Sequence, residues 1–278
     1  MLIRAIRNRS PRFLICGLLA FFAIPTASSP QSNDKGLAPA VAAALTKAKV
    51  KSVVVFDFIG PAERLNQLGQ DLADRLSLSL ENSSTKLHII DSATIRSVIE
   101  KNRVTPDVIR EPEIAWWLAR QLHADALIVG RLSTSNQLDI TVGLAKVHDG
   151  KEFEGFSMSM PLTAEMQKRL NTSLTEDYAG EFAKLGVNVS SMPSCISCPH
   201  PKYPEAGLAS KKQATVVLAV LIGEDGLAQK IAVTGPGPYG FTQKAIEAVQ
   251  SWKFKPANGL DGKPIGIWAP IEARFRLY

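Results

Sequence analysis

"QATVVLAVLIGEDGLAQKIAVTG", residues 213–235, is the stretch that decides the fold of the carboxy-terminal part of the chain. Apolar and polar residues alternate on both sides of Asp225-Gly226, and an Asp-Gly pair between two such runs is a strong signal for a hairpin turn. The stretch therefore predicts two antiparallel strands joined by a tight turn.

The residues that follow complete a small sheet. "FTQKAIEAVQSWKF" (241–254) carries an apolar stripe and predicts a helix that is capped by Thr242 and ended by Pro256; the stripe consists of Ala245, Ile246, Val249 and Trp252. "GIWAPIEARFRLY" (266–278) predicts a last strand. Two strands, a helix and a third strand predict an antiparallel three-stranded sheet with one packed helix. We interpret the lysines of "SWKFKPA" (251–257) as solvated side chains beside buried aromatics.

Residues 49–188 predict an α/β domain with a mixed sheet, so the expected fold class of the whole chain is α+β. "KSVVVFDF" (51–58) has the β-branched run of a buried strand, and leucines recur at helical spacing over 65–80. The order along the chain is a strand (51–58), a helix (65–80), a strand (86–90), two helices (93–102, capped by Asp91 or Ser92, and 113–124), three strands (125–133, 137–147 and 151–160) and a helix (164–185).

The remaining segments predict the boundaries of this organisation. Residues 29–48 are interpreted as a polar leader, of which 29–40 has no core, 189–202 as a Cys/Pro linker, and 203–278 as the second domain. A mature chain of about 250 residues suits two modest domains better than one.

The amino terminus predicts export. Residues 1–12 carry four arginines and no acid, and the apolar run "FLICGLLAFFAI" (13–24) is followed by small residues. A membrane-spanning helix needs about 20 apolar residues, so a cleaved signal over residues 1–28 is favoured. An uncleaved tether to the inner membrane stays open as the alternative.

Charge does not predict nucleic-acid binding. The formal net charge of +6 falls to +2 when the four signal arginines are removed. From Cys195 onward there are ten Lys/Arg against six Asp/Glu, without the clustered basic stripe that nucleic-acid binding needs.

Cys195 and Cys198, in "SCISCPHP" (194–201), are the only cysteines beyond the signal. An exported chain meets an oxidising space, which favours a short-loop disulfide within the chain. An intermolecular link, a redox centre and a zinc site with His200 as third ligand stay open, but Pro199 and Pro201 disfavour the helix that a redox motif needs.

No catalytic set, metal site or cofactor is predicted. His88, His123 and His148 lie at no metal-ligand spacing, and no Gly-rich phosphate loop occurs. Asp57 ends a predicted central strand, where we interpret it as facing a loop or capping the next helix, since the sequence places no second carboxylate beside it.

The quoted elements also resemble known families. "VVVFDF", "LHIIDSATIRSVI", "LARQLHADALIVGRL" and "LDITVGLAKVHDGK", over residues 50–160, resemble the exported α/β domains of curli-secretion and flagellar-assembly lipoproteins and the TolB amino-terminal region. That resemblance implies assembly and partner contact in the cell envelope, without a catalytic set.

"YPEAGLASKKQATVVLAVLIGEDGLAQKIAV", "AIEAVQSWKFKPA" and "IEARFRL" resemble the TonB carboxy-terminal domain over residues 200–278. The resemblance implies a non-enzymatic periplasmic module that binds an extended peptide of an envelope or outer-membrane protein by strand addition. It implies contact residues before the first strand and along the last one: His200, Pro201, Tyr203, Pro204, Ile271, Ala273 and Phe275.

The chain departs from an energy-transducing TonB protein. Its apolar run has no histidine, and a folded domain replaces the proline-rich spacer. Partner binding in the periplasm is therefore the leading interpretation, a membrane-anchored transducer the second, and an exported thiol or metal protein the third. A homodimer through exposed sheet edges stays possible.

Overall fold

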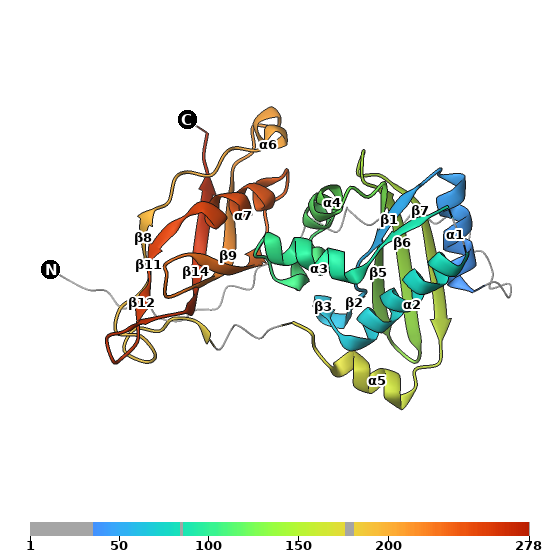
Figure 1. Cartoon of the computed structure of the whole chain (residues 1–278), viewed down its shortest axis with the longest axis horizontal. Helices are drawn as coiled ribbons and strands as arrows, with labels where there is room; N and C mark the ends of the chain where they lie inside the picture. Colours follow the sequence, from blue (N-terminus) through green and yellow to red (C-terminus); the bar gives the residue numbers. More distant parts are fainter. Residues whose placement is uncertain (1–35, 84–85, 176–180, 278) are drawn as a thin grey trace. The chain divides into compact units, whose positions relative to one another are not determined.

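The sheet of the amino-terminal region is built around β1 (Ser52–Val55), the β-branched run of the sequence. The structure is a computed structural model that describes residues 36–83, 86–175 and 181–277 (Figure 1). β1 lies between β4 (His88–Ile90) and β5 (Ala126–Thr134), and pairs with both in parallel. β6 (Leu138–Lys146) and β7 (Glu152–Met160) continue from β5 as antiparallel strands, so the predicted mixed sheet is confirmed.

Three short elements link β1 to the first long helix of this sheet. β2 (Ile59–Gly60) pairs with β5 and with β3 (Arg64–Leu65), and η1 (Pro61–Glu63) connects the two short strands. Gly69 in the next helix lies so close to the Phe58 carbonyl that a Cβ there would be 2.0 Å from the oxygen. The helix can approach the sheet only because this position is glycine.

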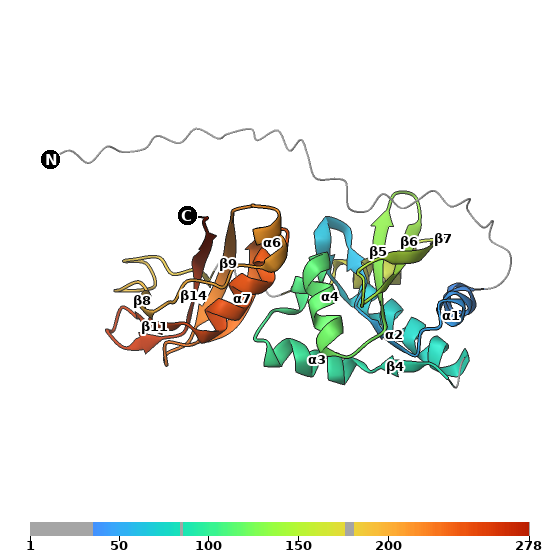
Figure 2. The same cartoon turned by 90° about the horizontal axis from the view of Figure 1, so that it is seen from above.

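Helices cover both faces of the sheet. Side chains alternate along β1, so Val54 packs toward α3 (Ser92–Lys101) and α4 (Pro112–Gln121). Val53 and Val55 pack toward α1 (Leu37–Lys47) and α2 (Gln67–Ser83) on the other face. Figure 2 shows the two pairs of helices on different sides of the strands.

The expectation of a polar leader over 29–48 is corrected by α1, a packed helix. Val41, Ala44 and Leu45 are buried in this helix and pack in the same cluster as Val53. Ala44 and Leu45 follow Val41 by three and four positions, so the three residues form a helical stripe that could have been recognised from the sequence. Residues 29–35 of the expected leader and the whole expected signal, 1–28, lie outside the described residues.

The helix predicted over 164–185 is shorter. α5 is Ala164–Asn171, and Thr163 caps it by accepting a hydrogen bond from Met166 N. Beyond it, the Leu174 amide donates to the Leu65 carbonyl, and Phe182 pairs as a bridge with Trp268. In the described residues on either side of 176–180, Leu174 and Phe182 therefore make long-range backbone contacts where the sequence predicted a helix. The other helix and strand limits predicted for residues 49–188 hold within a few residues, and Asp91 caps α3 by accepting a hydrogen bond from Thr94 N at 2.8 Å.

The carboxy-terminal sheet has the predicted form. β9 (Ala214–Ile222) lies between β10 (Ala228–Gly235) and β14 (Ile267–Phe275), and both pairings are antiparallel. α7 (Phe241–Ser251) packs on one face through Ala245, Ile246 and Val249. An antiparallel three-stranded sheet with one helix is confirmed.

Two details at α7 correct the sequence prediction. The helix begins after Gly240, whose φ of 82° suits glycine, while Thr242 Oγ1 bonds to Gly237. It ends at Ser251, because Trp252 is extended and Lys253–Lys255 forms β11. Phe254 is buried between two exposed lysines, which is the alternation of a strand, and the lysines are solvated as expected.

β11 pairs with β8 (Ser194–Ser197), so the expected Cys/Pro linker contains a strand. Other short elements of the described chain are η2 (Pro106–Arg110), α6 (Glu205–Ala209), β12 (Ala257–Asn258) and β13 (Pro264–Ile265).

Apolar packing connects the amino-terminal region that the structure describes with the carboxy-terminal sheet. Asp34–Tyr278 forms one compact unit, and one apolar cluster joins Val104 and Ile109 of the amino-terminal region to Leu218 and Ile231 of the carboxy-terminal sheet. The domain boundary at 189–202 stays a prediction.

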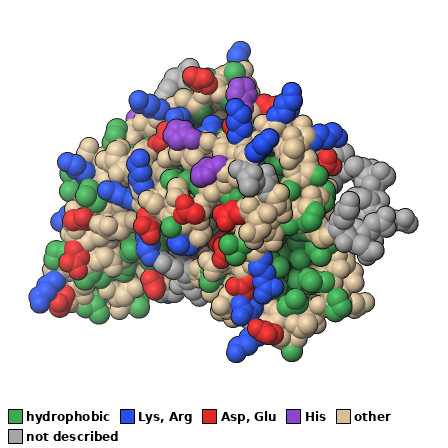
Figure 3. Space-filling model, turned by 45° about the vertical axis from the view of Figure 1, so that its right-hand side comes forward, with side chains coloured by type: hydrophobic (Ala, Val, Ile, Leu, Met, Phe, Trp, Pro, Cys, Tyr) green, Lys and Arg blue, Asp and Glu red, His purple; other side chains and the backbone are tan. Residues whose placement is uncertain are grey.

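Within residues 36–83, 86–175 and 181–277, none of the helices has the length and apolar character needed to cross a membrane. The face drawn in Figure 3 carries side chains of both charges, and hydrophobic side chains gather in one part of it.

Candidate functional site

β14 is an edge strand with most of its outer side open. All nine residues pair with β9, from Ile267 opposite Ile222 to Phe275 opposite Ala214. On the outer side, Phe182 forms a parallel bridge with Trp268, and the Ala183 amide donates to the Trp268 carbonyl at 2.9 Å. Among the described residues, no backbone hydrogen bond reaches the outer side from Pro270 to Phe275.

The direction of the main-chain groups in this edge follows from Trp268 and Pro270. In an antiparallel strand, successive residues direct their N–H and C=O groups to alternate neighbours. Trp268 directs its carbonyl outward to Ala183, and Pro270, two residues on, has no N–H to offer β9. Glu272 and Arg274 continue the same alternation. The open edge therefore offers the N–H and C=O groups of Glu272 and Arg274 and the Pro270 carbonyl.

The side chains of the predicted contact residues in the last strand lie on the face of the sheet that packs against α7. Ala273 and Phe275 are each 1 % exposed and pack with α7, whereas Ile271 is half-buried beside the same cluster. Glu272 and Arg274 are exposed on the other face and form an ion pair at 2.6 Å. The sequence prediction did not include Glu272 and Arg274, whose N–H and C=O groups face the open edge. Pro270 was a usable signal, because a proline in a strand indicates that its nitrogen faces away from the neighbouring strand.

The segment before the first strand reaches the end of β14. The Tyr203 ring lies 5.8 Å from the Phe275 ring and 5.3 Å from the Phe241 ring, each edge to face. Pro199 O accepts a hydrogen bond from Trp252 Nε1 at 3.0 Å. The fold thus brings Tyr203 and Phe275 together.

The other predicted residues of this segment differ in exposure. His200 is exposed, Pro201 is half-buried and Pro204 is buried. His200 therefore has a side chain open to solvent, whereas Pro204 has a packing role.

The opposite edge of the sheet, along β10, is occupied by the amino-terminal region. The Ile231 amide donates to Arg103 O at 2.7 Å, and the Thr105 amide donates to Ile231 O at 2.9 Å. Arg103 Nη1 donates to Ala228 O, and Arg110 Nη2 donates to Val233 O at 2.7 Å. These bonds leave β14 as the edge with an open stretch.

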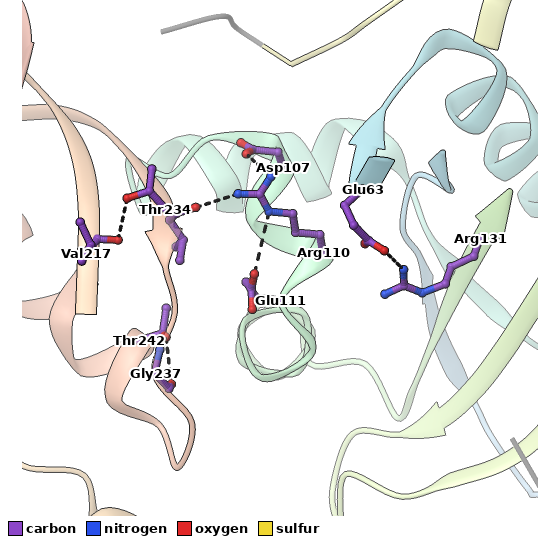
Figure 4. A network of polar contacts seen from close by, with 10 residues as sticks. Glu63, Asp107, Arg110, Glu111, Arg131, Val217, Thr234, Gly237 and Thr242 are labelled. Atoms are coloured by element: carbon purple, nitrogen blue, oxygen red, sulfur yellow. Dashed lines mark hydrogen bonds and ion pairs between the residues drawn. The ribbon is translucent and has the colours of Figure 1, made fainter. Parts of the chain in front are cut away.

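Arg110 is held in place by two carboxylates (Figure 4). Its guanidinium lies 3.5 Å from Asp107, which is 2 % exposed, and 3.9 Å from Glu111. Burial raises the pKa of Glu111, while the charge of Arg110 lowers it. The sequence gives no signal for the hydrogen bond from Arg110 to the Val233 carbonyl, because these two residues lie more than a hundred positions apart.

Cys195 and Cys198 are joined as a disulfide in β8. Their sulfur atoms are bonded to each other, so neither is a free thiolate in this state. The described ranges hold no group of three or more His, Cys, Asp or Glu side chains placed to bind a metal ion.

The fold and this edge define a class of protein, one that presents a small antiparallel sheet with an open strand. Residues 199–277 match the family model of the Gram-negative bacterial TonB protein C-terminal. The carboxy-terminal resemblance seen in the sequence is thereby confirmed. A comparison with curated protein sequences gave no match.

Parts of the chain are similar to solved structures. The LpoB C-terminal domain from Escherichia coli is 18% identical, covers 44% of this chain and 93% of its own, and has a TM-score of 0.38. Lipoprotein GNA1162 from Neisseria meningitidis is 15% identical over 41% of this chain and 83% of its own, with a TM-score of 0.34. The Pseudomonas aeruginosa TonB CTD is 23% identical over 31% of this chain and 88% of its own, with a TM-score of 0.27.

Proposed function

We propose that this is a periplasmic protein of the cell envelope that binds an extended segment of a partner protein as an added strand on β14. The observation that carries the proposal is the outer edge from Pro270 to Phe275, which has no backbone partner among the described residues. Strand addition uses such an edge, since main-chain hydrogen bonds supply affinity and alternate side chains supply specificity.

The surroundings of the edge favour an external strand. The outer edge of β10 is occupied from Ala228 to Val233 by hydrogen bonds with Arg103, Thr105 and Arg110. A partner strand therefore cannot pair with that part of the sheet. On β14 an incoming strand meets Pro270 and the Glu272–Arg274 ion pair on one face, with Ile271 and Tyr203 on the other. His200 and Pro201 extend the second face. The protein acts by binding and carries no catalytic step, and residues 1–28 export it.

The organisation of the chain suits this function. Residues 49–188 form the docking or assembly platform, and 203–278 form the partner-binding module. The Cys195–Cys198 disulfide stiffens the segment that leads to Tyr203.

The decisive experiment removes one outward amide without disturbing the sheet. In Glu272→Pro the N–H that faces the open edge is lost, while Glu272→Ala loses the same side chain and keeps the N–H. Proline is accepted on edge strands where the nitrogen faces solvent, as Pro270 already does two residues earlier. A photoreactive phenylalanine in place of Arg274 reports whatever lies along the edge.

We expect the protein that carries only the photoreactive residue, and the same protein with Glu272→Ala, to cross-link to an extended segment of one envelope protein in the native host. Glu272→Pro should lower the cross-link yield at least about tenfold, the equivalent of about 1.4 kcal/mol, because one hydrogen bond is lost and the proline ring obstructs the partner strand. Unchanged cross-linking in a folded Glu272→Pro protein would rule out strand addition at β14.

A further inference from the structure

A pocket of about 850 Å³ lies at the carboxyl ends of β1 and β4. Asp57 follows β1 and Asp91 follows β4, and both line it together with residues of α2 and α3. In α/β sheets, ligands bind in the crevice outside the carboxyl ends of parallel strands. We call it the Asp57 pocket; its lining includes Phe56, Asp57, Asp74, Leu78, Asp91 and Arg96.

Asp57 is a desolvated carboxylate of the pocket. Asp91 accepts two hydrogen bonds from Thr94, at 2.8 and 2.7 Å, whereas no hydrogen bond to Asp57 is found within the described chain. Burial, followed by the charge of Asp74, raises the pKa of Asp57 from 3.8 to about 6, although Arg96 opposes this. A desolvated carboxylate without a hydrogen bond gains most from a cation that brings its own donors.

The whole lining carries excess negative charge. The charged residues that face the pocket are Asp57 after β1, Asp74 and Glu81 from α2, Asp91 before α3, Arg96 and Glu100 from α3, Arg103 beyond it and Lys230 from β10. Five are acids and three are bases. Arg103 is also committed to Ala228 O of the carboxy-terminal sheet.

Apolar side chains surround this charge. Phe56, Ile90 and Ile95 line the pocket, while Leu78 and Leu174 line it and remain 59% and 37% exposed. Exposed apolar side chains beside a pocket are typical of protein-binding surfaces. Arginine suits such a place, because its guanidinium is weakly hydrated, donates five N–H groups and is enriched among the energetically dominant residues of interfaces.

We propose that the Asp57 pocket is a second docking site, which holds an arginine side chain of a partner protein flanked by apolar residues. The guanidinium donates to Asp57 with Asp74 beside it, and the flanking residues cover Leu78 and Leu174. This site is separate from the β14 edge, so either can be lost without the other.

The test uses two peptides that differ in charge alone, acetyl-Leu-Arg-Leu-amide and its citrulline counterpart, which has nearly the same shape and no charge. Each is titrated into the full mature chain, and backbone amide resonances are followed by nuclear magnetic resonance. We expect the arginine peptide to shift the resonances of Asp57, Asp74 and Arg96 and to bind at least about tenfold more tightly than the citrulline peptide.

Asp57→Asn should reduce the affinity for the arginine peptide to that of the citrulline peptide. Asp149→Asn, in an exposed turn, is the matched control and should bind as the wild type does. Affinity in the wild type should fall between pH 7 and pH 5, since protonation of Asp57 removes the charge, and this fall should be absent in Asp57→Asn. Equal binding of the two peptides, no binding of either, or unchanged binding by Asp57→Asn would each overturn the proposal.

Discussion

Replacing Asp57 by asparagine should stabilise the protein at neutral pH. The pKa of Asp57 is raised from 3.8 to about 6 in the folded chain, mainly by burial. The folded state therefore holds the proton more tightly than the unfolded state does. As pH rises from about 4 to about 6 the unfolded state loses its proton first, so this group lowers the free energy of unfolding across that window.

The size of the effect follows from the two pKa values. One pKa unit corresponds to about 1.4 kcal/mol, so the gap between 3.8 and about 6 corresponds to about 3 kcal/mol at pH 7. Asparagine has nearly the same shape and no charge. Asp57→Asn should therefore raise the free energy of unfolding by up to about 3 kcal/mol at pH 7 and by only about 0.5 kcal/mol at pH 4.

Urea denaturation followed by circular dichroism, at intervals from pH 4 to pH 7.5, measures this difference. Asp74→Asn should give a smaller gain at neutral pH, because the charge of Asp74 is the second cause of the shift. Asp149→Asn provides the exposed control. If Asp57→Asn and the wild type keep a constant stability difference across this range, the argument from the buried carboxylate fails.

Two further predictions concern the β10 contact and the amino terminus. Arg110→Ala should lower the free energy of unfolding by about 3 kcal/mol, because it removes the bond to Val233 O and leaves the buried Asp107 carboxylate without its cation. Arg274→Ala, which breaks an exposed pair, should cost at most about 1 kcal/mol in the same denaturation assay, and equal losses would contradict the reasoning. The intact mass of protein from the native envelope, taken without reductant, should lack about 28 residues and two hydrogens; a mass that includes Met1 to Ile24 would restore the anchored transducer.

Local patterns determined most of the secondary structure. Alternation around Asp225-Gly226 and the stripe of Ala245, Ile246 and Val249 give the three-stranded sheet and its helix, because turn chemistry and burial on one face are recorded within a few residues. The run at Val53–Val55 likewise marks a strand buried on both faces. The same patterns failed where long-range pairing competed with them. Phe182, which the sequence places in a helix continuing from α5, instead forms a backbone bridge with Trp268.

The candidate sites depended on tertiary structure. Which edge of the sheet is open follows from bonds such as that between Arg103 and Ala228, 125 residues apart, and no local pattern encodes them. The sequence predicts that Asp57 faces a loop or caps the next helix, without a second carboxylate beside it. The fold brings Asp74 from α2 near enough to raise its pKa. Charge interactions and edge occupancy depend on distances through space, which the chain acquires only when its separate elements pack together.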